Sequence, residues 1–278
     1  MKKGILTALA FTFFILSTNG QVVDSSLKKY NKAFNGYKLR PGFDLPMTAG
    51  GVLWSLYGMN KIYNRDTVPA SEILALNSQN VESFDRSATK NYNRNAFNVS
   101  NYLFYGAMPL PMLMMFDRKI RKEGAKIALL YLEAQAITGT IYTISAMKAN
   151  RFRPYAYNPN VDIDKRTRGG VRNSFYAGHV ALVGTSTFFM AKTWSDYHPE
   201  MRNKWALYTI AAGLTATTGI MRIKAGEHFP SDVIVGSILG PAVGFLVPHF
   251  HKSKKNNRMV FLPKFGEEGN GMTMLYRL

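Results

Sequence analysis

The chain has 278 residues, no cysteine, 46% hydrophobic residues and a formal net charge of +18 at pH 7. Without cysteine it has no disulfide framework. The basic balance invites a nucleic-acid interpretation, but no recognised nucleic-acid-binding module is present and the aromatic residues lie in or beside apolar runs, so we expect no nucleic-acid partner.

The N-terminus has the pattern of a secretory signal peptide. Lys2 and Lys3 precede an apolar stretch from Ile5 to Leu16, and small or polar residues follow it. This pattern predicts a signal peptide over residues 1–20, because the apolar stretch is too short for a comfortable membrane span. An uncleaved N-terminal anchor is the alternative.

Residues 21–95 are mixed in character and are punctuated by proline and glycine. Within them, Leu45 to Asn60 is apolar enough for an interfacial or re-entrant helix. We predict a partly helical N-terminal region that does not span the membrane.

Long apolar runs dominate the rest of the chain up to residue 251. Their lengths are close to the roughly 20 residues that cross a bilayer as a helix, and they contain few turn signals. They predict an all-α, membrane-embedded bundle of about five or six helices over residues 96–251, with a soluble helical protein of the periplasm as the alternative. Glu133, within one run, is either a functional residue or one packed against a neighbouring helix. The runs are Asn95–Phe116, Ile127–Met147, Asn173–Ala191, Trp205–Met221 and Val233–His251.

Two segments beside these runs carry polar groups. Residues 148–154 contain three cations, which by themselves are typical of charges that flank a membrane span. Gly178 and His179 stand directly before an apolar run, at a predicted helix start. A glycine there lets a ligand approach the backbone, and the free N–H groups and positive end of the helix dipole favour an anion.

A third segment joins an arginine, a histidine and a carboxylate. Pro230 suits the first turn of a helix, which places His228 at the helix start and Asp232 about one turn inside. A carboxylate that orients an imidazole makes a competent nucleophile, and the Arg222 guanidinium offers bidentate recognition of phosphate oxygens. Taken alone, the spacing also fits a solvated histidine and a helix-starting aspartate. Together with Gly178 and His179 at a second helix start, it predicts a phosphate-holding site.

In this order the three segments resemble the type 2 phosphatidic acid phosphatase superfamily, which includes lipid phosphatases, bacterial acid phosphatases and vanadate haloperoxidases. The resemblance extends over roughly residues 96–251. Arg222, His228 and Asp232 fall at the spacing of the third family motif, and only its serine is replaced, by Met221.

The second family motif, Pro-Ser-Gly-His, keeps Gly178 and His179 but has Tyr176 and Ala177 in its first two positions. A lost serine hydroxyl removes one hydrogen bond to a bound phosphate.

The first motif, a lysine followed by six residues and Arg-Pro, keeps Arg153 and Pro154. Its lysine position is Ala146, with Lys148 two residues closer to the arginine. We hypothesise that the long side chain of Lys148 reaches the same phosphate oxygens.

The resemblance implies a metal-independent phosphatase without a cofactor. His228 attacks phosphorus to form a phosphohistidine, Asp232 fixes its ring, and His179 protonates the leaving alkoxide and then activates water. No cluster with metal-ligand spacing is visible in the sequence, and His198, His249 and His251 resemble interface or tail residues. The groups expected to hold the phosphate oxygens are Arg153, Arg222, Lys148 and the backbone N–H of Gly178.

Charge placement predicts the topology. If the signal peptide is removed and five helices cross, the Lys- and Arg-rich connections at residues 117–126 and 192–204 and the tail at 252–258 face the cytoplasm, and the motifs face the periplasm. A retained N-terminal anchor together with a span at Leu45 to Asn60 is the alternative, which leaves the number of spans open. The basic segment 148–177 breaks the rule, and a site for a phosphorylated lipid supplies a reason. Residues 252–278 form a tail with a possible hairpin.

Two alternatives stay open. The same anion cradle, in relatives, holds vanadate and oxidises halides, although those relatives are usually longer and soluble. The second alternative is a catalytically weak or inactive membrane protein of the same fold, because Ala146 and Ala177 replace a lysine and a serine of the family motifs. Neither the particular lipid phosphate nor the oligomeric state follows from the sequence.

Overall fold

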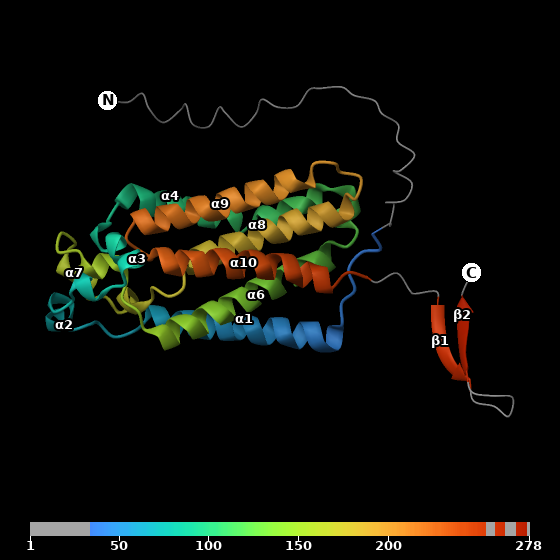
Figure 1. Ribbon diagram of the computed structural model, residues 1–278, viewed down its shortest axis with the longest axis horizontal. Helices are drawn as coiled ribbons and strands as arrows, with labels where there is room; N and C mark the ends of the chain where they lie inside the picture. Colours follow the sequence, from blue (N-terminus) through green and yellow to red (C-terminus); the bar gives the residue numbers. More distant parts are fainter. Residues whose placement is uncertain (1–33, 254–258, 265–270, 277–278) are drawn as a thin grey trace, which may run out of the picture. The chain divides into compact units, whose positions relative to one another are not determined.

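The computed structural model describes residues 34–253, 259–264 and 271–276. The predicted signal peptide lies outside these residues. Six long helices form the bundle (Figure 1). They are α1 (Pro41–Tyr63), α4 (Arg94–Ala107), α6 (Gly124–Ala149), α8 (Gly178–Tyr197), α9 (Lys204–Lys224) and α10 (Pro230–Phe250).

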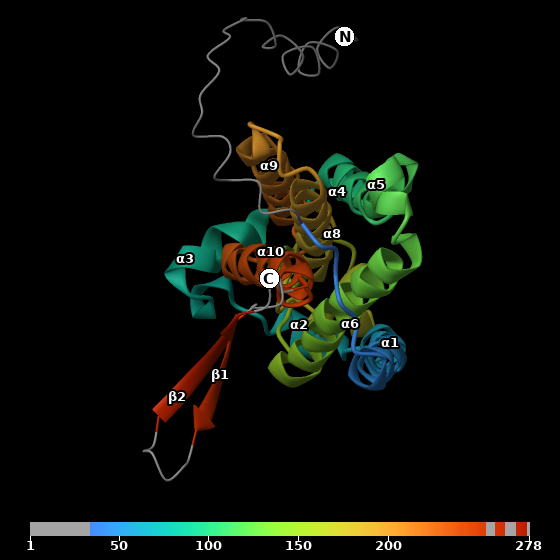
Figure 2. The ribbon, with the colours of Figure 1, turned by 90° about the vertical axis from the view of Figure 1, so that its right-hand side faces the viewer.

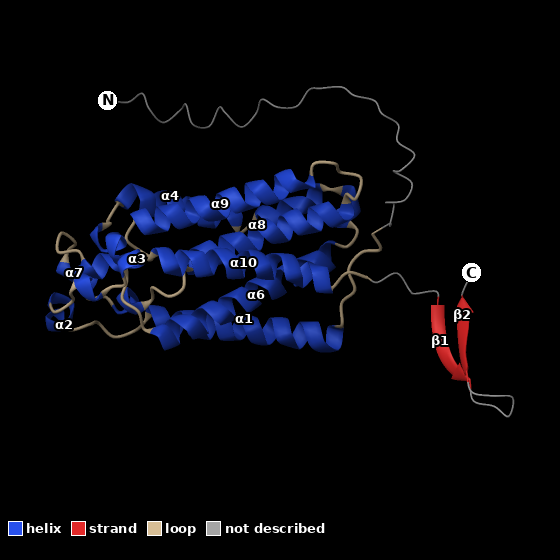
Figure 3. Cartoon of the chain, in the orientation of Figure 1, coloured by secondary structure: helices blue, strands red, loops and turns tan. Residues whose placement is uncertain are grey.

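Successive long helices run in alternate directions. The connections at 64–93, 150–177 and 225–229 gather at one end of the bundle, which we call the motif end and which lies on the left in Figure 3. The connections at 108–123 and 198–203 lie at the opposite end, called the far end. Short helices fill the connections: α2 (Ala70–Leu74), η3 (Ser78–Asn80), α3 (Ser83–Arg86), η4 (Ser87–Lys90), η5 (Leu110–Phe116), α5 (Arg118–Arg121), η6 (Pro154–Tyr157), α7 (Ile163–Arg166) and η7 (Gly169–Arg172).

Helix α8 is the central helix of the bundle, buried along most of its length between α10, α9, α6 and α4 (Figure 2). Small residues let α8 and α10 approach closely. A Cβ atom on Gly240 of α10 would lie 2.1 Å from the carbonyl oxygen of Ala181 of α8, so a larger residue would separate the two helices. Both helices begin at the motif end, and their close packing fixes the two starts side by side.

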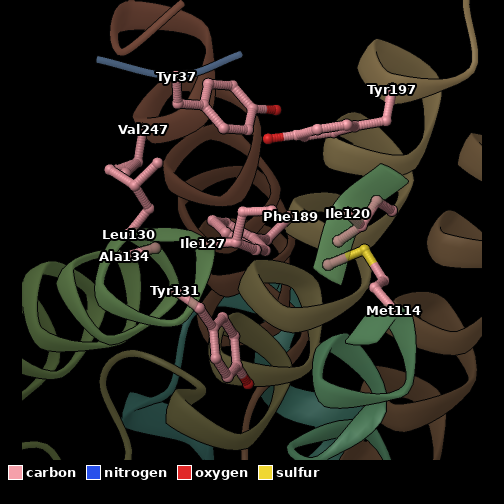
Figure 4. Packing of buried hydrophobic residues seen from close by; sticks show 10 residues of the cluster. All are labelled: Tyr37, Met114, Ile120, Ile127, Leu130, Tyr131, Ala134, Phe189, Tyr197 and Val247. Atoms are coloured by element: carbon pink, nitrogen blue, oxygen red, sulfur yellow. The ribbon is translucent and has the colours of Figure 1, made fainter. Parts of the chain in front are cut away.

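An apolar core closes the far end (Figure 4). It joins α6, α8 and α10 with the segment that precedes α1, whose Tyr37 hydroxyl donates to Asp196 at 3.0 Å. Its buried members are Tyr37, Met114, Ile120, Ile127, Leu130, Tyr131, Ala134, Phe189, Tyr197 and Val247.

Three expectations about elements need correction. The run 95–116 is not one helix, because Pro109 and Pro111 interrupt it and only a 3₁₀ turn follows α4. Residues 173–177 are not helical and precede α8 as an irregular segment. The stretch from Leu45 to Asn60 is helical, as expected, but it is not re-entrant, since it belongs to the continuous helix α1, which packs along α6.

Two helical segments among the described residues are long and apolar enough to cross a membrane, Gly124–Tyr157 and Pro230–Phe250. Helix α10 is buried on one side only, and bulky apolar side chains on its other side are exposed, among them Ile234, Ile238, Leu246 and Phe250. Bulky apolar side chains are also exposed along α1, α4 and α9; examples are Leu53, Trp54, Leu56, Tyr102, Tyr105, Trp205, Ile210 and Ile220. Exposed apolar surface on this scale marks an interaction surface.

In the tail, β1 (Met259–Lys264) pairs antiparallel with β2 (Gly271–Tyr276), with Met259 opposite Tyr276. This pairing falls in the segment for which the sequence predicts a hairpin.

Candidate active site

His228 lies just before α10, with Pro230 at the first helical position as predicted. Its side chain is 1% exposed, and Nδ1 donates to the carbonyl oxygen of Ser174 at 2.6 Å. Because a carbonyl only accepts, Nδ1 carries the proton and Nε2 keeps its lone pair. Burial lowers the pKa of His228 well below its ordinary value, and the charges of Arg153 and Arg222 lower it further. The ring is therefore neutral, with its lone pair available.

Asp232 lies in the first turn of α10 and is fully buried. It accepts hydrogen bonds from Ser174 Oγ at 2.6 Å, from the Phe229 backbone N–H at 2.9 Å and from Arg151 Nη1 at 2.5 Å. The prediction that Asp232 itself fixes the His228 ring is wrong, because the partner of the ring is the Ser174 carbonyl. Asp232 acts one step away, by holding the residue that holds the ring.

Arg222, in the last turn of α9, lies between α4 and the start of α8. Its Nη2 is 3.0 Å from Nδ1 of His179, and its Nη1 is 3.3 Å from both Ser100 Oγ and Asn101 Oδ1. Arg222 is 2% exposed, whereas His179 is partly exposed, with its ring centroid 4.5 Å from that of Phe104. Thus His179 sits nearer the surface than His228 does.

Arg153 is also buried, and its Nη1 forms an ion pair with Glu227. Its backbone N–H donates to Val171 at 2.8 Å, which fixes the start of η6. The Nε atoms of Arg153 and Arg222 are both buried without a hydrogen-bond partner among the described residues. Buried guanidinium N–H groups are normally hydrogen-bonded. Two arginines with unpaired Nε donors, whose charges both act on His228, therefore indicate a binding place for an anion.

Gly178 begins α8, as predicted. A Cβ atom there would lie 2.8 Å from the Tyr142 ring, so this packing requires glycine. The two residues that replace the proline and serine of the second motif are buried: Tyr176 donates to the Thr138 carbonyl at 3.3 Å, and the Ala177 N–H donates to the Asp232 carbonyl at 3.1 Å. They contribute packing, and neither side chain supplies a hydroxyl that replaces the family serine.

Lys148 lies exposed in the last turn of α6, and the structure records no hydrogen bond or ion pair for it within the described residues. Asn150, with φ of 46°, ends the helix directly after it. Ala146, in the position of the family lysine, is 1% exposed and packs against Tyr142 and Tyr176. The role of Lys148 in binding phosphate stays a prediction.

The network around Arg151 was not predicted from the sequence. Its Nη2 lies 2.7 Å from Asp85 in α3, and the Ser231 backbone N–H donates to the same carboxylate at 2.9 Å. The Arg151 guanidinium also stacks 4.2 Å above the Phe229 ring. Burial raises the pKa of Asp85, but hydrogen bonds from Ser231 and Arg151 outweigh it and leave that pKa below its ordinary value. An ionised Asp85 thus anchors residues 64–93 on the start of α10.

Two further contributions were missed. One face of α4, formed by Phe97, Ser100, Asn101 and Phe104, covers Arg222 and His179. The spacing of these residues is that of a helix face, which was a usable signal. Glu227, directly before His228, carried no signal because its partner Arg153 is distant in sequence.

One comparison with known proteins overlaps the three motifs. The sequence model of the PAP2 superfamily matches residues 127–256. One similar solved structure is a transmembrane PAP2 type phosphatidylglycerolphosphate phosphatase from Bacillus subtilis, with 21% identity and a TM-score of 0.46, covering 73% of this chain and 95% of that chain. Another is LpxE from Aquifex aeolicus, with 22% identity and a TM-score of 0.40, covering 58% and 90%. A comparison with curated protein sequences finds no match.

Proposed function

We propose that this chain is a metal-independent phosphatase of the PAP2 superfamily, whose sequence model matches residues 127–256, and that it hydrolyses a lipid phosphate or pyrophosphate monoester. The observation that carries this proposal is the pairing of a buried, neutral His228 with two buried arginines that each keep an unpaired N–H donor. Such a group of residues is suited to one tetrahedral oxyanion beside one nucleophile.

The first half-reaction forms a phosphohistidine. The Nε2 lone pair of His228 attacks phosphorus while the bond to the leaving oxygen breaks. The positive charge that develops on the ring is stabilised at Nδ1–H by the Ser174 carbonyl, whose residue is held by Asp232. The buried carboxylate thus contributes through position and field, without direct contact with the ring.

The phosphoryl oxygens gain charge stabilisation from the guanidinium groups. In phosphoryl transfer most catalysis is positioning and electrostatic stabilisation, and buried, prearranged donors are suited to both. The Nε donors of Arg153 and Arg222 and the free N–H groups at the start of α8 fill this role. Glu227 holds Arg153 in place before the substrate binds.

His179 is the general acid and then the general base. Its partly exposed position suits a group that must reach both a departing alkoxide and an incoming water. Arg222 orients the His179 ring through its Nη2 atom, which lies 3.0 Å from Nδ1 of that ring. In the second half-reaction, water attacks the phosphohistidine, His179 accepts its proton, and His228 is regenerated.

A lipid substrate is supported by the outer surface of the bundle. Helix α10 begins in the active site and continues as an apolar helix whose outward face is mostly unburied. A membrane-embedded bundle explains both this face and the exposed aromatic residues of α1 and α4. The active site then lies at one membrane face, where a lipid phosphate group resides.

The positive-inside rule orients the bundle in this proposal, because the far-end connections 117–126 and 192–204 are rich in Lys and Arg. The far end then faces the cytoplasm and the motif end the periplasm. Since the chain has no cysteine, single cysteines report the orientation directly. A membrane-impermeant maleimide should label Lys148→Cys in intact spheroplasts and Arg118→Cys only after permeabilisation, and the reverse pattern would contradict this orientation.

Release of inorganic phosphate from a panel of lipid phosphates and pyrophosphates tests the function. The purified protein should release phosphate from at least one member, and His228→Asn should not. Asn keeps a donor for the Ser174 carbonyl, so it tests the nucleophile more than the packing. His249→Ala, an exposed histidine at the far end, is the matched control and should remain active. Equal release from wild type and His228→Asn would end the proposal, and a folded but inactive wild type would favour a binding or structural member of the fold.

A further inference from the structure

Three side chains from distant parts of the chain meet at the far end: Asp44 of α1, Glu133 of α6 and His251 at the end of α10. One ligand atom from each lies within 4.8 Å of the others. We propose that they bind a divalent transition-metal ion, with Zn²⁺ as the best fit, in a structural site separate from the phosphatase centre. The sequence predicted no such cluster and treated His251 as a tail residue, because separations this large in the chain carry no spacing signal.

The distances fit coordination better than direct pairing. His251 Nε2 lies 3.4 Å from Asp44 Oδ1 and 3.8 Å from Glu133 Oε2. A charge-assisted hydrogen bond between these groups would be about 2.7–2.9 Å long. Ligands about 2.0–2.2 Å from a tetrahedral ion lie roughly 3.3–3.6 Å from one another, which is close to the spacing observed.

The groups around the three ligands orient them toward a common point. His251 Nδ1 lies 2.8 Å from the Val247 carbonyl, so Nδ1 carries a proton and Nε2 is the ring atom that faces the two carboxylates and is available as a ligand. Asp44 Oδ2 accepts the Arg40 backbone N–H at 2.5 Å, which leaves Oδ1 for a ligand. Metal-binding histidines and carboxylates are typically held in this way by their second atoms.

Glu133 gives a second, independent indication of a bound ion, because one of its carboxylate oxygens is buried without a hydrogen-bond partner among the described residues. The Glu133 side chain is 2% exposed, and the unpaired oxygen is Oε2. A buried carboxylate oxygen is normally paired or bound to a metal. Two carboxylates and a neutral imidazole carry a charge of −2, which one divalent ion neutralises. A mixed oxygen and nitrogen set of this kind suits Zn²⁺ or Mn²⁺.

The metal site would join three helices without contacting the catalytic residues of the phosphatase centre. His228 precedes α10 and His251 follows it, so the two histidines are separated by a helix about 30 Å long. Asp44 belongs to α1, outside the residues that match the family. A metal here ties α1 to α6 and to the end of α10, and its removal should loosen the bundle without removing any catalytic group.

Metal binding to the purified full-length protein in detergent tests the proposal. After treatment with EDTA and addition of Zn²⁺, we expect about one equivalent of bound zinc and a rise in Tm of about 5 °C at a hundredfold excess over Kd. Co²⁺ should give the visible absorption bands of a coordinated ion. Glu133→Gln and His251→Ala should lose all three signals, whereas His249→Ala, two residues from His251 and exposed, should keep them.

The wild-type measurements decide the question even if a variant fails to fold. A wild type that takes up no stoichiometric zinc and gives no Co²⁺ bands would overturn the proposal and leave a histidine–carboxylate ion pair. Equal uptake by folded His251→Ala and His249→Ala would overturn it too. The result is separable from the phosphatase proposal, because His228→Asn should bind zinc as the wild type does.

Discussion

At each end of α10 a histidine is held by a backbone carbonyl, but the charged groups that face the two histidines have opposite signs. At the motif end, a histidine donates Nδ1–H to the Ser174 carbonyl and faces two arginines; at the far end, a histidine donates Nδ1–H to the Val247 carbonyl and faces two carboxylates. In each case Nε2 is the ring atom that faces the charged groups. In the two proposals the surroundings decide the chemistry, because the imidazole beside the arginines attacks an electrophilic phosphorus and the imidazole beside the carboxylates binds a cation.

The unpaired atoms make the same distinction. Two buried donors without partners among the described residues, the Nε atoms of Arg153 and Arg222, act on His228 at the motif end, and a buried acceptor without a partner, Glu133 Oε2, faces His251 at the far end; other unpaired buried atoms, such as Asn173 Oδ1 and His198 Nε2, lie outside these two clusters. Because an unpaired buried polar atom is costly, its sign indicates the charge of the ligand that completes it. An anion is expected at one end and a cation at the other.

The substitution Arg222→Lys tests most directly whether the two ends bind ligands of opposite charge independently. Lysine keeps the charge but loses the fork that reaches His179 and the phosphate, so kcat/KM for the lipid phosphate should fall by about 10²–10³-fold. Orthophosphate should raise the Tm of the wild type but not of this variant, while the zinc response persists. His251→Ala should show the reverse. Loss of both responses in either variant would mean that the two ends are not independent.

The network around Arg151 gives a smaller effect. Arg151→Ala removes the group that joins Asp85 to Asp232, so the segment that positions His228 should loosen and kcat should fall about tenfold with little change in KM. Arg118→Ala removes an exposed arginine at the far end and should leave kcat unchanged. A raised KM with normal kcat would instead place Arg151 in substrate binding.

A pH effect on stability should come from the motif end. The folded pKa of His228 lies below its ordinary value of 6.5, so the unfolded chain takes up a proton that the folded chain refuses. The stability is complete above pH 6.5 and is lost as the pH falls below it, by about 2–4 °C in Tm over the first unit. His228→Asn should flatten this decline and His249→Asn should not; parallel curves for all three proteins would contradict a buried neutral ring.

The smallest expected effect is that of Lys148→Ala. Lys148 is exposed and separated from the buried cations by the end of α6, so its removal should change the phosphatase rate by less than about twofold. A tenfold loss would show that its side chain reaches the substrate after all and would restore the lysine of the first motif.

Local patterns predicted the parts of the site that local structure determines. Pro230 fixed the start of α10 and Gly178 the start of α8, because these residue types have definite preferences at helix ends. The all-helical bundle followed from the apolar runs. Partnerships across the chain did not follow, since the link from His228 to Ser174 and that from Arg153 to Glu227 depend on how the connections 150–177 and 225–229 fold together.

The errors have a similar origin. The expectation for Asp232 assumed that a carboxylate one turn inside a helix reaches the preceding imidazole, whereas Ser174 and Arg151 occupy its oxygens first. The far-end cluster was invisible because Asp44, Glu133 and His251 come from the first, third and last long helices. Sequence spacing indicates a metal site only where the ligands are close in the chain.

Trapping of the covalent intermediate tests the central claim most directly. With p-nitrophenyl [³²P]phosphate, whose leaving group needs no acid, His179→Asn should accumulate enzyme labelled through an acid-labile, alkali-stable bond, and the labelled peptide should contain His228. No label should form when His228→Asn is added to this background. Labelling that persists without His228, or label found on another residue, would contradict the assignment of His228 as the nucleophile.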